Sequence, residues 1–161
     1  ADIADYGRSP EEAEANFFAA ALLMSKPLIA PGLSKRDPEF KVVEELAREF
    51  SVTRTAAARR MVDLSKHAVM LVSSNGQEVN WCARSASARS VFVAPGSPIP
   101  LHSVTAECVA RGARASEPEA VDPAIWFPDL QVSDDFELFE EMRYSSTYRA
   151  ALTLLWLPGL S

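Results

Sequence analysis

Residues up to about His67 carry apolar side chains at the three- and four-residue spacing of helices that are apolar on one side. Ser9-Pro10-Glu11-Glu12 is a helix-start signal: a serine N-cap, proline at the first helical position, and glutamate three residues after the cap. We expect this helix to continue to about Met24. Its apolar stripe consists of Ala15, Phe18, Ala19, Leu22 and Leu23.

Two further helices are predicted before His67. Residues 26–36 hold two prolines and a glycine and are expected to form an irregular connection. Asp37-Pro38 then starts a helix, and Thr53 can cap the next one after a short break at residues 51–53. The expected inward residues are Phe40, Val43, Leu46, Ala47 and Phe50 in one helix, and Ala57, Met61 and Leu64 in the other. Two short helices joined by such a turn have the shape of a helix-turn-helix.

Beyond His67 the pattern becomes that of a sheet with occasional helices. Asn75-Gly76 is a hairpin signal after the short apolar run 68–72, and residues 148–157 are nearly all apolar, as in a central strand. The expected strands are Ala68–Val72, Gln77–Ala83, Ser90–Ala94, Phe136–Tyr144 and Tyr148–Leu157, the last two forming a hairpin, and Pro100–Arg111 is expected to be a helix ended by Gly112.

Composition narrows the functional classes. The chain has 161 residues, of which 48% are hydrophobic and 24% charged, so a packed core is expected. No apolar run approaches the roughly 18 residues of a membrane span, and we expect a cytoplasmic protein with no membrane partner. Cys82 and Cys108 are expected to be reduced thiols. The net charge of −6 weakens the case for a nucleic-acid binder without excluding a local basic patch.

One segment resembles a family signature. Residues 12–24 read Glu-Ala-Glu-Ala-Asn-Phe-Phe-Ala-Ala-Ala-Leu-Leu-Met. They are similar to the Glu-x-x-Ala-Asn-x-Phe-Ala-x-x-Leu-Leu-Met-Pro block of ImmA/IrrE metallopeptidases, which follows that family's His-Glu-x-x-His helix. The sequence departs from the pattern at Ser25, where the family has proline; here the proline is Pro27.

The likeness continues along the chain. Residues 46–61 look like the family's helix-turn-helix element, and residues from His67 to Leu157 look like the GAF-like third domain of its radiation-response branch, through Trp126-Phe127 and the closing strand. The expected fold is therefore α+β. The expected parts are a remnant of the metallopeptidase domain (1–36), a helix-turn-helix-like helical module (37–66) and a GAF-like mixed α/β domain (67–161).

The resemblance implies a zinc site to which this chain contributes one ligand. In the family two histidines and a glutamate hold zinc. The glutamate corresponds to Glu12, with Glu14 as the alternative, and Asn16 lies on the same helix face as Glu12, where it could orient the carboxylate. Without the resemblance, Glu12 would be interpreted as a capping-box residue. His67 and His102 are 35 positions apart and cannot replace a histidine pair on one helix.

Two functions follow as alternatives. The first is part of a regulatory zinc metallopeptidase that, by resemblance, cleaves a helix-turn-helix repressor in a stress response. Because the chain begins at Ala1 and lacks His-Glu-x-x-His, we expect it to be truncated, metal-free and inactive alone. The second is a non-enzymatic transcriptional regulator with a sensor domain, in which Arg54, Arg59 and Arg60 contact DNA or a partner. A small-molecule pocket near Trp81, Trp126 or Trp156 is a further possibility, although core packing is the commoner role of tryptophan.

Overall fold

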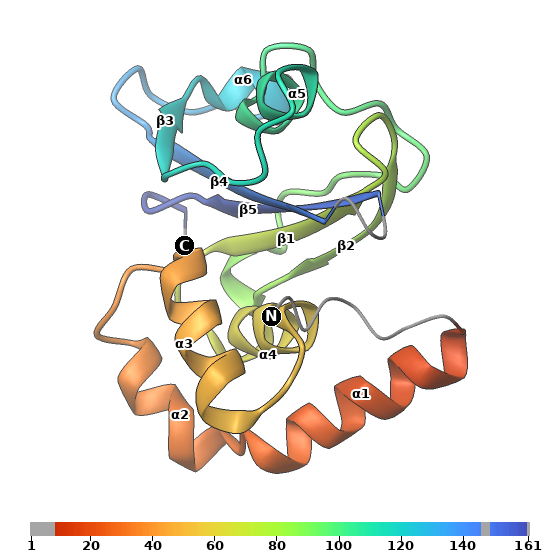
Figure 1. The fold of residues 1–161 in the computed structure, drawn as a ribbon. Helices are drawn as coiled ribbons and strands as arrows, with labels where there is room; N and C mark the ends of the chain where they lie inside the picture. The colour runs from red at the N-terminus through yellow and green to blue at the C-terminus, as the bar shows by residue number, and fades with distance from the viewer. Residues whose placement is uncertain (1–8, 146–148, 161) are drawn as a thin grey trace.

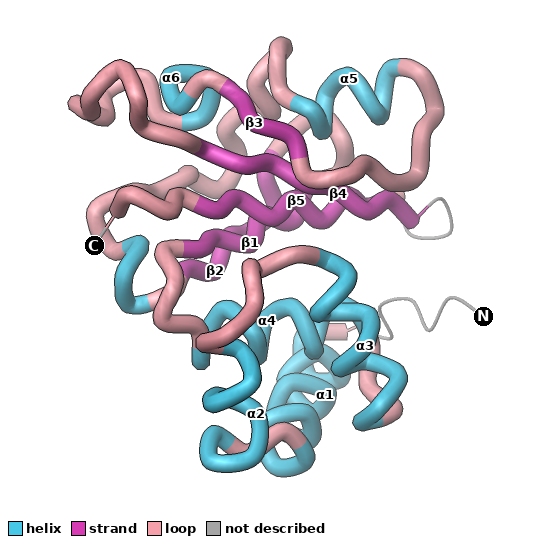
Figure 2. The backbone as a smooth tube through the Cα atoms, turned by 90° about the vertical axis from the view of Figure 1, so that its left-hand side faces the viewer, coloured by secondary structure: helices cyan, strands magenta, loops and turns pink. Residues whose placement is uncertain are grey.

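A computed structural model describes residues 9–145 and 149–160, which form three layers with a sheet in the middle (Figure 1). One face of the sheet carries the four helices of residues 10–64. The other face carries the two short helices of the later part, together with long connections (Figure 2). The described part therefore has the α+β composition that the sequence predicts.

The first helical layer consists of α1 (Pro10–Leu23), α2 (Lys26–Leu33), α3 (Phe40–Phe50) and α4 (Arg54–Leu64). The predicted caps of α1 and α4 are confirmed. The Glu12 N–H donates to Ser9 Oγ (3.2 Å), and the Ala56 N–H donates to Thr53 Oγ1 (3.1 Å). These bonds satisfy amide groups that have no carbonyl partner in the first turn of a helix.

The expectation of an irregular connection at residues 26–36 is wrong, because α2 occupies most of it. Pro27 lies in the first turn, where a missing N–H costs nothing. Pro31 lies inside the helix, and the helix ends within one turn of it. Ile29 and Leu33, four residues apart, are buried in the core, and this packing outweighs the proline and glycine content of the segment.

The sheet has five antiparallel strands in the order β2-β1-β5-β4-β3. The antiparallel pairing of β1 with β2 confirms the predicted hairpin at Asn75-Gly76, and β4 pairs with β5 as predicted. Residues 146–148, between β4 and β5, lie outside the described residues. The continuous apolar run at the end of the chain is a central strand, as predicted. The strand bounds are β1 Val69–Ser74, β2 Val79–Arg84, β3 Glu119–Val121, β4 Leu138–Ser145 and β5 Ala150–Trp156.

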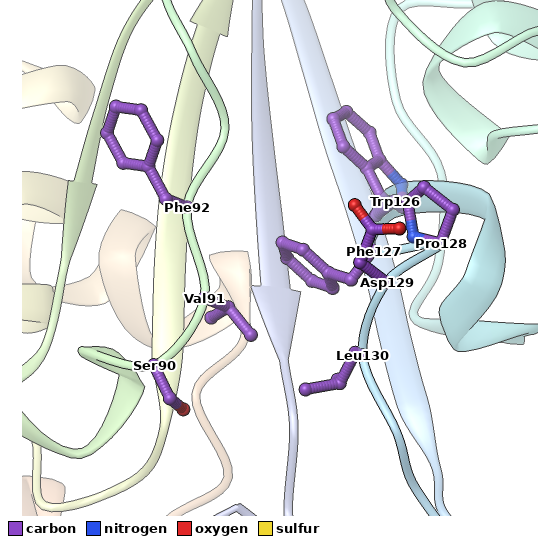
Figure 3. A pocket seen from close by; sticks show the side chains of 8 residues that line it. All are labelled: Ser90, Val91, Phe92, Trp126, Phe127, Pro128, Asp129 and Leu130. Carbon is purple, nitrogen blue, oxygen red and sulfur yellow. The ribbon is translucent and has the colours of Figure 1, made fainter.

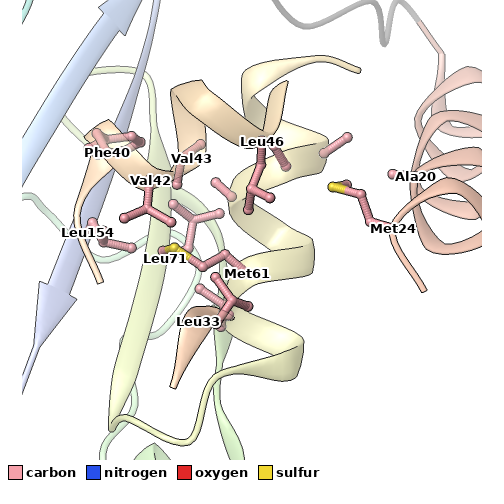
Figure 4. Close-up of a cluster of buried hydrophobic side chains, with 14 of the residues drawn as sticks. Ala20, Met24, Leu33, Phe40, Val42, Val43, Leu46, Met61, Leu71 and Leu154 are labelled. Carbon is pink, nitrogen blue, oxygen red and sulfur yellow. The ribbon is translucent and has the colours of Figure 1, made fainter. Parts of the chain in front are cut away.

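Alternation along β1 and β5 builds a core on each face of the sheet. Leu71 and Leu154 pack against the helical layer (Figure 4), whereas Met70 and Leu155 pack on the opposite face. Successive side chains of a strand point to opposite faces, so a strand covered on both sides must be apolar throughout. Because the helices and the sheet share a core, they form one packed unit. The domain boundary at residue 66 stays a prediction.

Two predicted elements on the second face differ from expectation. Residues 90–94 do not form a strand: the Val91 and Val93 carbonyls accept hydrogen bonds from the side chains of Arg84 and Cys82 instead of from a ladder. The helix expected over Pro100–Arg111 is shorter: α5 spans Val104–Ala110 and is capped by Ser103. Leu101, expected on its apolar face, is 85% exposed in the preceding turn.

Three short elements were not predicted from the sequence: the 3₁₀ helix η1 (Ala86–Ala88), the strand β3 and the single-turn helix α6 (Pro123–Trp126). Asp122 caps α6 by accepting a hydrogen bond from the Ala124 N–H (2.9 Å). Each is shorter than the window over which a periodic pattern can be recognised. The helix-turn-helix assignment of residues 37–66 and the GAF-like assignment of residues 67–161 stay predictions.

No single helix among residues 9–145 and 149–160 combines the length and apolar character needed to cross a bilayer. Within the same residues, α1 and α2 taken together have the length and composition of a membrane span, but the chain bends by 81° between them.

Candidate functional site

Glu12 lies in the first turn of α1, at the end of the helix that projects from the body of the protein (Figure 1). Its side chain is exposed, and Asn16, one turn later on the same face, is half-buried. The same face continues through Ala20 and Met24, which are buried in the core shared with α4. Glu14 is exposed as well, but it is offset by about 200° round the helix.

These residues do not make a zinc site by themselves. Protein zinc sites use three or four ligands, and within the described residues no three histidine, cysteine, aspartate or glutamate side chains gather in a way that could hold a metal ion. The two histidines lie apart. The His67 ring meets the Trp156 ring edge-on (centroids 5.7 Å apart), and His102 is exposed in the turn before α5.

The arginines proposed for DNA contact have partners within the protein. The Arg59 guanidinium lies over the rings of Phe17 (5.1 Å) and Trp81 (5.5 Å). Arg60 Nε donates to the carbonyl of Met24, the C-cap residue of α1 (2.8 Å). Arg54 Nε lies 3.6 Å from Glu44 Oε1. Arg59 and Arg60 thus connect α4 to α1, and Arg59 also connects it to β2.

Replacing Arg59 by alanine is therefore expected to lower the free energy of unfolding by about 1–2 kcal/mol, because two cation–π contacts and the packing of the side-chain stem are lost. Urea unfolding followed by circular dichroism measures this. Arg48, exposed in the last turn of α3, provides the control: Arg48→Ala is expected to change stability by less than about 0.5 kcal/mol. Equal stability of the two variants would show that the Arg59 contacts contribute nothing.

Glu140 on β4, which the sequence did not single out, has a carboxylate that accepts four hydrogen bonds. It is fully buried on the face that carries α5. The backbone N–H groups of Val104 (3.0 Å) and Thr105 (2.8 Å), the Thr105 hydroxyl (2.8 Å) and Trp126 Nε1 (2.9 Å) all donate to it. The carboxylate thus accepts from the first turn of α5, where the helix dipole favours negative charge, and anchors α6 through its tryptophan.

Glu141, the next residue, performs the corresponding role on the opposite face. The Phe40 N–H at the start of α3 donates to Glu141 Oε2 (2.8 Å), and Arg143 Nη2 lies 3.2 Å from its Oε1. Arg143 also donates to Glu44 Oε1 (2.8 Å). Burial raises the pKa of the Glu141 carboxyl, against the opposing effects of the Phe40 N–H and Arg143. Adjacent residues of one strand thus hold helices on both sides of the sheet.

A sequence signal for this pair exists. Glu140-Glu141 stands between Leu138-Phe139 and Met142, inside a segment predicted to be a strand. Charged residues are almost never buried without partners, so two adjacent acids in such a strand indicate hydrogen-bond donors on its two faces. The sequence cannot say which donors these are, because Phe40 and Thr105 are far from Glu140-Glu141 in the chain.

Comparison with known proteins finds one family. Residues 2–62 match the family described as the IrrE N-terminal-like domain (Peptidase_M78). No curated protein matches the chain. The matched segment includes α1, α2, α3 and nearly all of α4, and it contains Glu12 and Asn16 but no histidine. The match supports a relation between this helical part and the ImmA/IrrE metallopeptidases.

Proposed function

We propose that this chain is part of a zinc-dependent regulatory metallopeptidase, in which Glu12 provides the third metal ligand and Asn16 helps to orient its carboxylate. The observation that carries the proposal is the family match over residues 2–62, together with the exposed position of Glu12 on α1. The histidine pair would come from a His-Glu-x-x-His helix that is not among these 161 residues. The chain alone is therefore expected to be inactive.

The exposed apolar surface of α1 supports the proposal that a further helix packs on it. Phe18, Leu22 and Leu23 are 67%, 66% and 52% exposed, although the helix also buries Ala20 on another face. Neighbouring large apolar side chains on one helix surface are normally covered, so their exposure favours a packing partner there. An additional helix packed on this surface would cover the exposed side chains and bring its own residues near the first turn of α1.

The substrate we propose, by family resemblance, is a helix-turn-helix repressor whose cleavage starts a stress response, with the sheet-containing part as a GAF-like sensor. The alternative, a non-enzymatic regulator that binds DNA through Arg54, Arg59 and Arg60, has less support. Each of these arginines has a partner inside the protein. A side chain engaged in this way must give up its contacts before it can reach a phosphate.

The test uses the protein encoded by the complete open reading frame. Zinc content is measured after gel filtration for the wild type, Glu12→Gln and the matched control Glu14→Gln. Because Glu12 is the proposed ligand and Glu14 lies on another side of the helix, the zinc affinity of Glu12→Gln is expected to fall at least tenfold. Glu12→Gln is therefore expected to lose most of its zinc during gel filtration, whereas Glu14→Gln keeps it. Circular dichroism verifies that both variants fold. Full zinc occupancy in Glu12→Gln, or loss in Glu14→Gln alone, would contradict the assignment.

A further inference from the structure

A pocket opens on the face of the sheet opposite the four-helix layer (Figure 3). One wall is formed by Ser90, Val91 and Phe92, and the other by residues 126–130, which follow from α6. The pocket has a volume of about 250 Å³, close to the lower end of the range for small-molecule sites, so it fits only a small ligand. The sheet separates the pocket from helices α1 to α4, so the pocket is independent of the proposed metal site.

Hydrogen bonds hold both walls in place. On one side, Trp126 Nε1 donates to the buried Glu140 carboxylate (2.9 Å), and the Leu130 N–H donates to the Phe127 carbonyl (3.0 Å). On the other side, Arg84 Nη1 donates to the Val91 carbonyl (2.6 Å). A ligand would therefore meet a largely preformed surface and would not have to order the walls, which favours affinity.

The pocket is lined by aromatic and aliphatic side chains together with polar groups, and acidic charge lies on one wall only. Phe127 and Val91 point into the space between the walls, and Leu130 lies below them in Figure 3. Asp129 is the one charged residue that lines it. Its side chain is exposed, and no ion pair to it occurs within residues 9–145 and 149–160. A carboxylate beside aromatic rings favours a cation, and the aromatic and aliphatic lining residues favour one that also carries a hydrocarbon group.

The opposite wall sets the orientation. The Arg84 guanidinium lies over the Phe92 ring (5.4 Å to its centroid), so positive charge already occupies that side. An ammonium group would be repelled there and attracted at Asp129. The hydrocarbon part of the ligand would then extend towards Val91.

We propose that this pocket binds a small organic cation, a primary amine carrying one aromatic or branched apolar group, with its ammonium at Asp129 and its apolar body between Val91 and Phe127. Because the pocket wall contains Trp126, whose indole is anchored to the carboxylate that also holds the first turn of α5, occupancy is expected to perturb the Trp126 indole signal.

The experiment titrates the intact 161-residue chain, labelled with ¹⁵N, with three probes of similar shape: 2-phenylethylammonium, 2-phenylethanol and phenylacetate. The Trp126 indole N–H resonance, assigned with Trp126→Phe, reports binding. The cation is expected to bind at least threefold more tightly than the alcohol, the range expected for an exposed charge pair with aromatic neighbours, and phenylacetate is expected to bind most weakly.

Two variants separate the pocket from nonspecific charge attraction. Asp129→Asn is expected to remove the preference for the cation, whereas Asp134→Asn, an exposed aspartate outside the pocket, is expected to retain it. Both positions are exposed, so folding should be unaffected. The proposal is overturned if none of the probes gives a saturable shift, if the three bind equally, or if the preference survives Asp129→Asn.

Discussion

Replacement of Glu140 by alanine is expected to be the most damaging single change on β4, with a loss of about 3–5 kcal/mol in the free energy of unfolding. Two backbone N–H groups at the start of α5 and the Trp126 indole lose their acceptor in a fully buried position. Each unsatisfied buried donor costs about 1–3 kcal/mol. The Thr105 hydroxyl can still pair with Thr153 Oγ1, 2.6 Å away, which limits the loss.

Urea unfolding measures this effect, and two further variants give it a scale. Glu140→Gln keeps the shape but turns one acceptor into a donor, so an intermediate loss is expected. Glu137→Ala, at an exposed position three residues earlier, is expected to stay within about 0.5 kcal/mol of wild type. If Glu140→Ala were as stable as Glu137→Ala, the carboxylate would not be holding α5 and α6 on the sheet.

Phe40→Ala is expected to lower the free energy of unfolding by about 3–5 kcal/mol, the range for removing a buried aromatic side chain. Phe40 is fully buried between α3 and the sheet, and the Arg143 guanidinium lies over its ring (5.1 Å to the centroid). The backbone bond from Phe40 to Glu141 is retained in the variant, so the loss reports the side chain alone.

Thermal and urea unfolding of Phe40→Ala are compared with Phe18→Ala. Phe18 is 67% exposed on α1, and its removal from this chain is expected to change stability by less than about 0.5 kcal/mol. Similar losses in both variants would indicate that α3 does not pack on the sheet as described.

Local chemistry made much of the fold predictable. Ser9 and Thr53 predict the starts of their helices, because each side-chain oxygen accepts a hydrogen bond from the N–H three residues later in the first turn. The apolar run of β5 indicates a central strand because both of its faces are covered. In each case the deciding contact lies within a few residues or depends only on burial.

Prediction failed where distant residues decide the outcome. Residues 26–33 are helical because Ile29 and Leu33 pack in a hydrophobic core with residues of α3 and α4. Residues 90–94 have the alternating pattern of a strand, yet Arg84 and Cys82 take the carbonyls that a ladder would use. Propensity and periodicity do not contain these tertiary contacts.

The candidate site was predictable only in part. The resemblance selects Glu12 and Asn16, and α1 places them on one helix face with Glu12 exposed. The intramolecular contacts of Arg59 and Arg60 could not be foreseen, because Trp81 and the end of α1 approach α4 only in the folded chain. The pocket beside Trp126 likewise depends on two segments, residues 90–92 and 126–130, which lie on opposite sides of it.

The central claim, that α1 contributes a carboxylate to a zinc site, is tested most directly by locating the metal. The protein encoded by the complete open reading frame would be crystallised with zinc, and anomalous scattering recorded on both sides of the zinc edge. The account predicts a peak about 2.0–2.2 Å from a Glu12 carboxylate oxygen, together with two histidine ligands from outside these 161 residues. A zinc peak remote from α1, or one bound through Glu14 in place of Glu12, would contradict it.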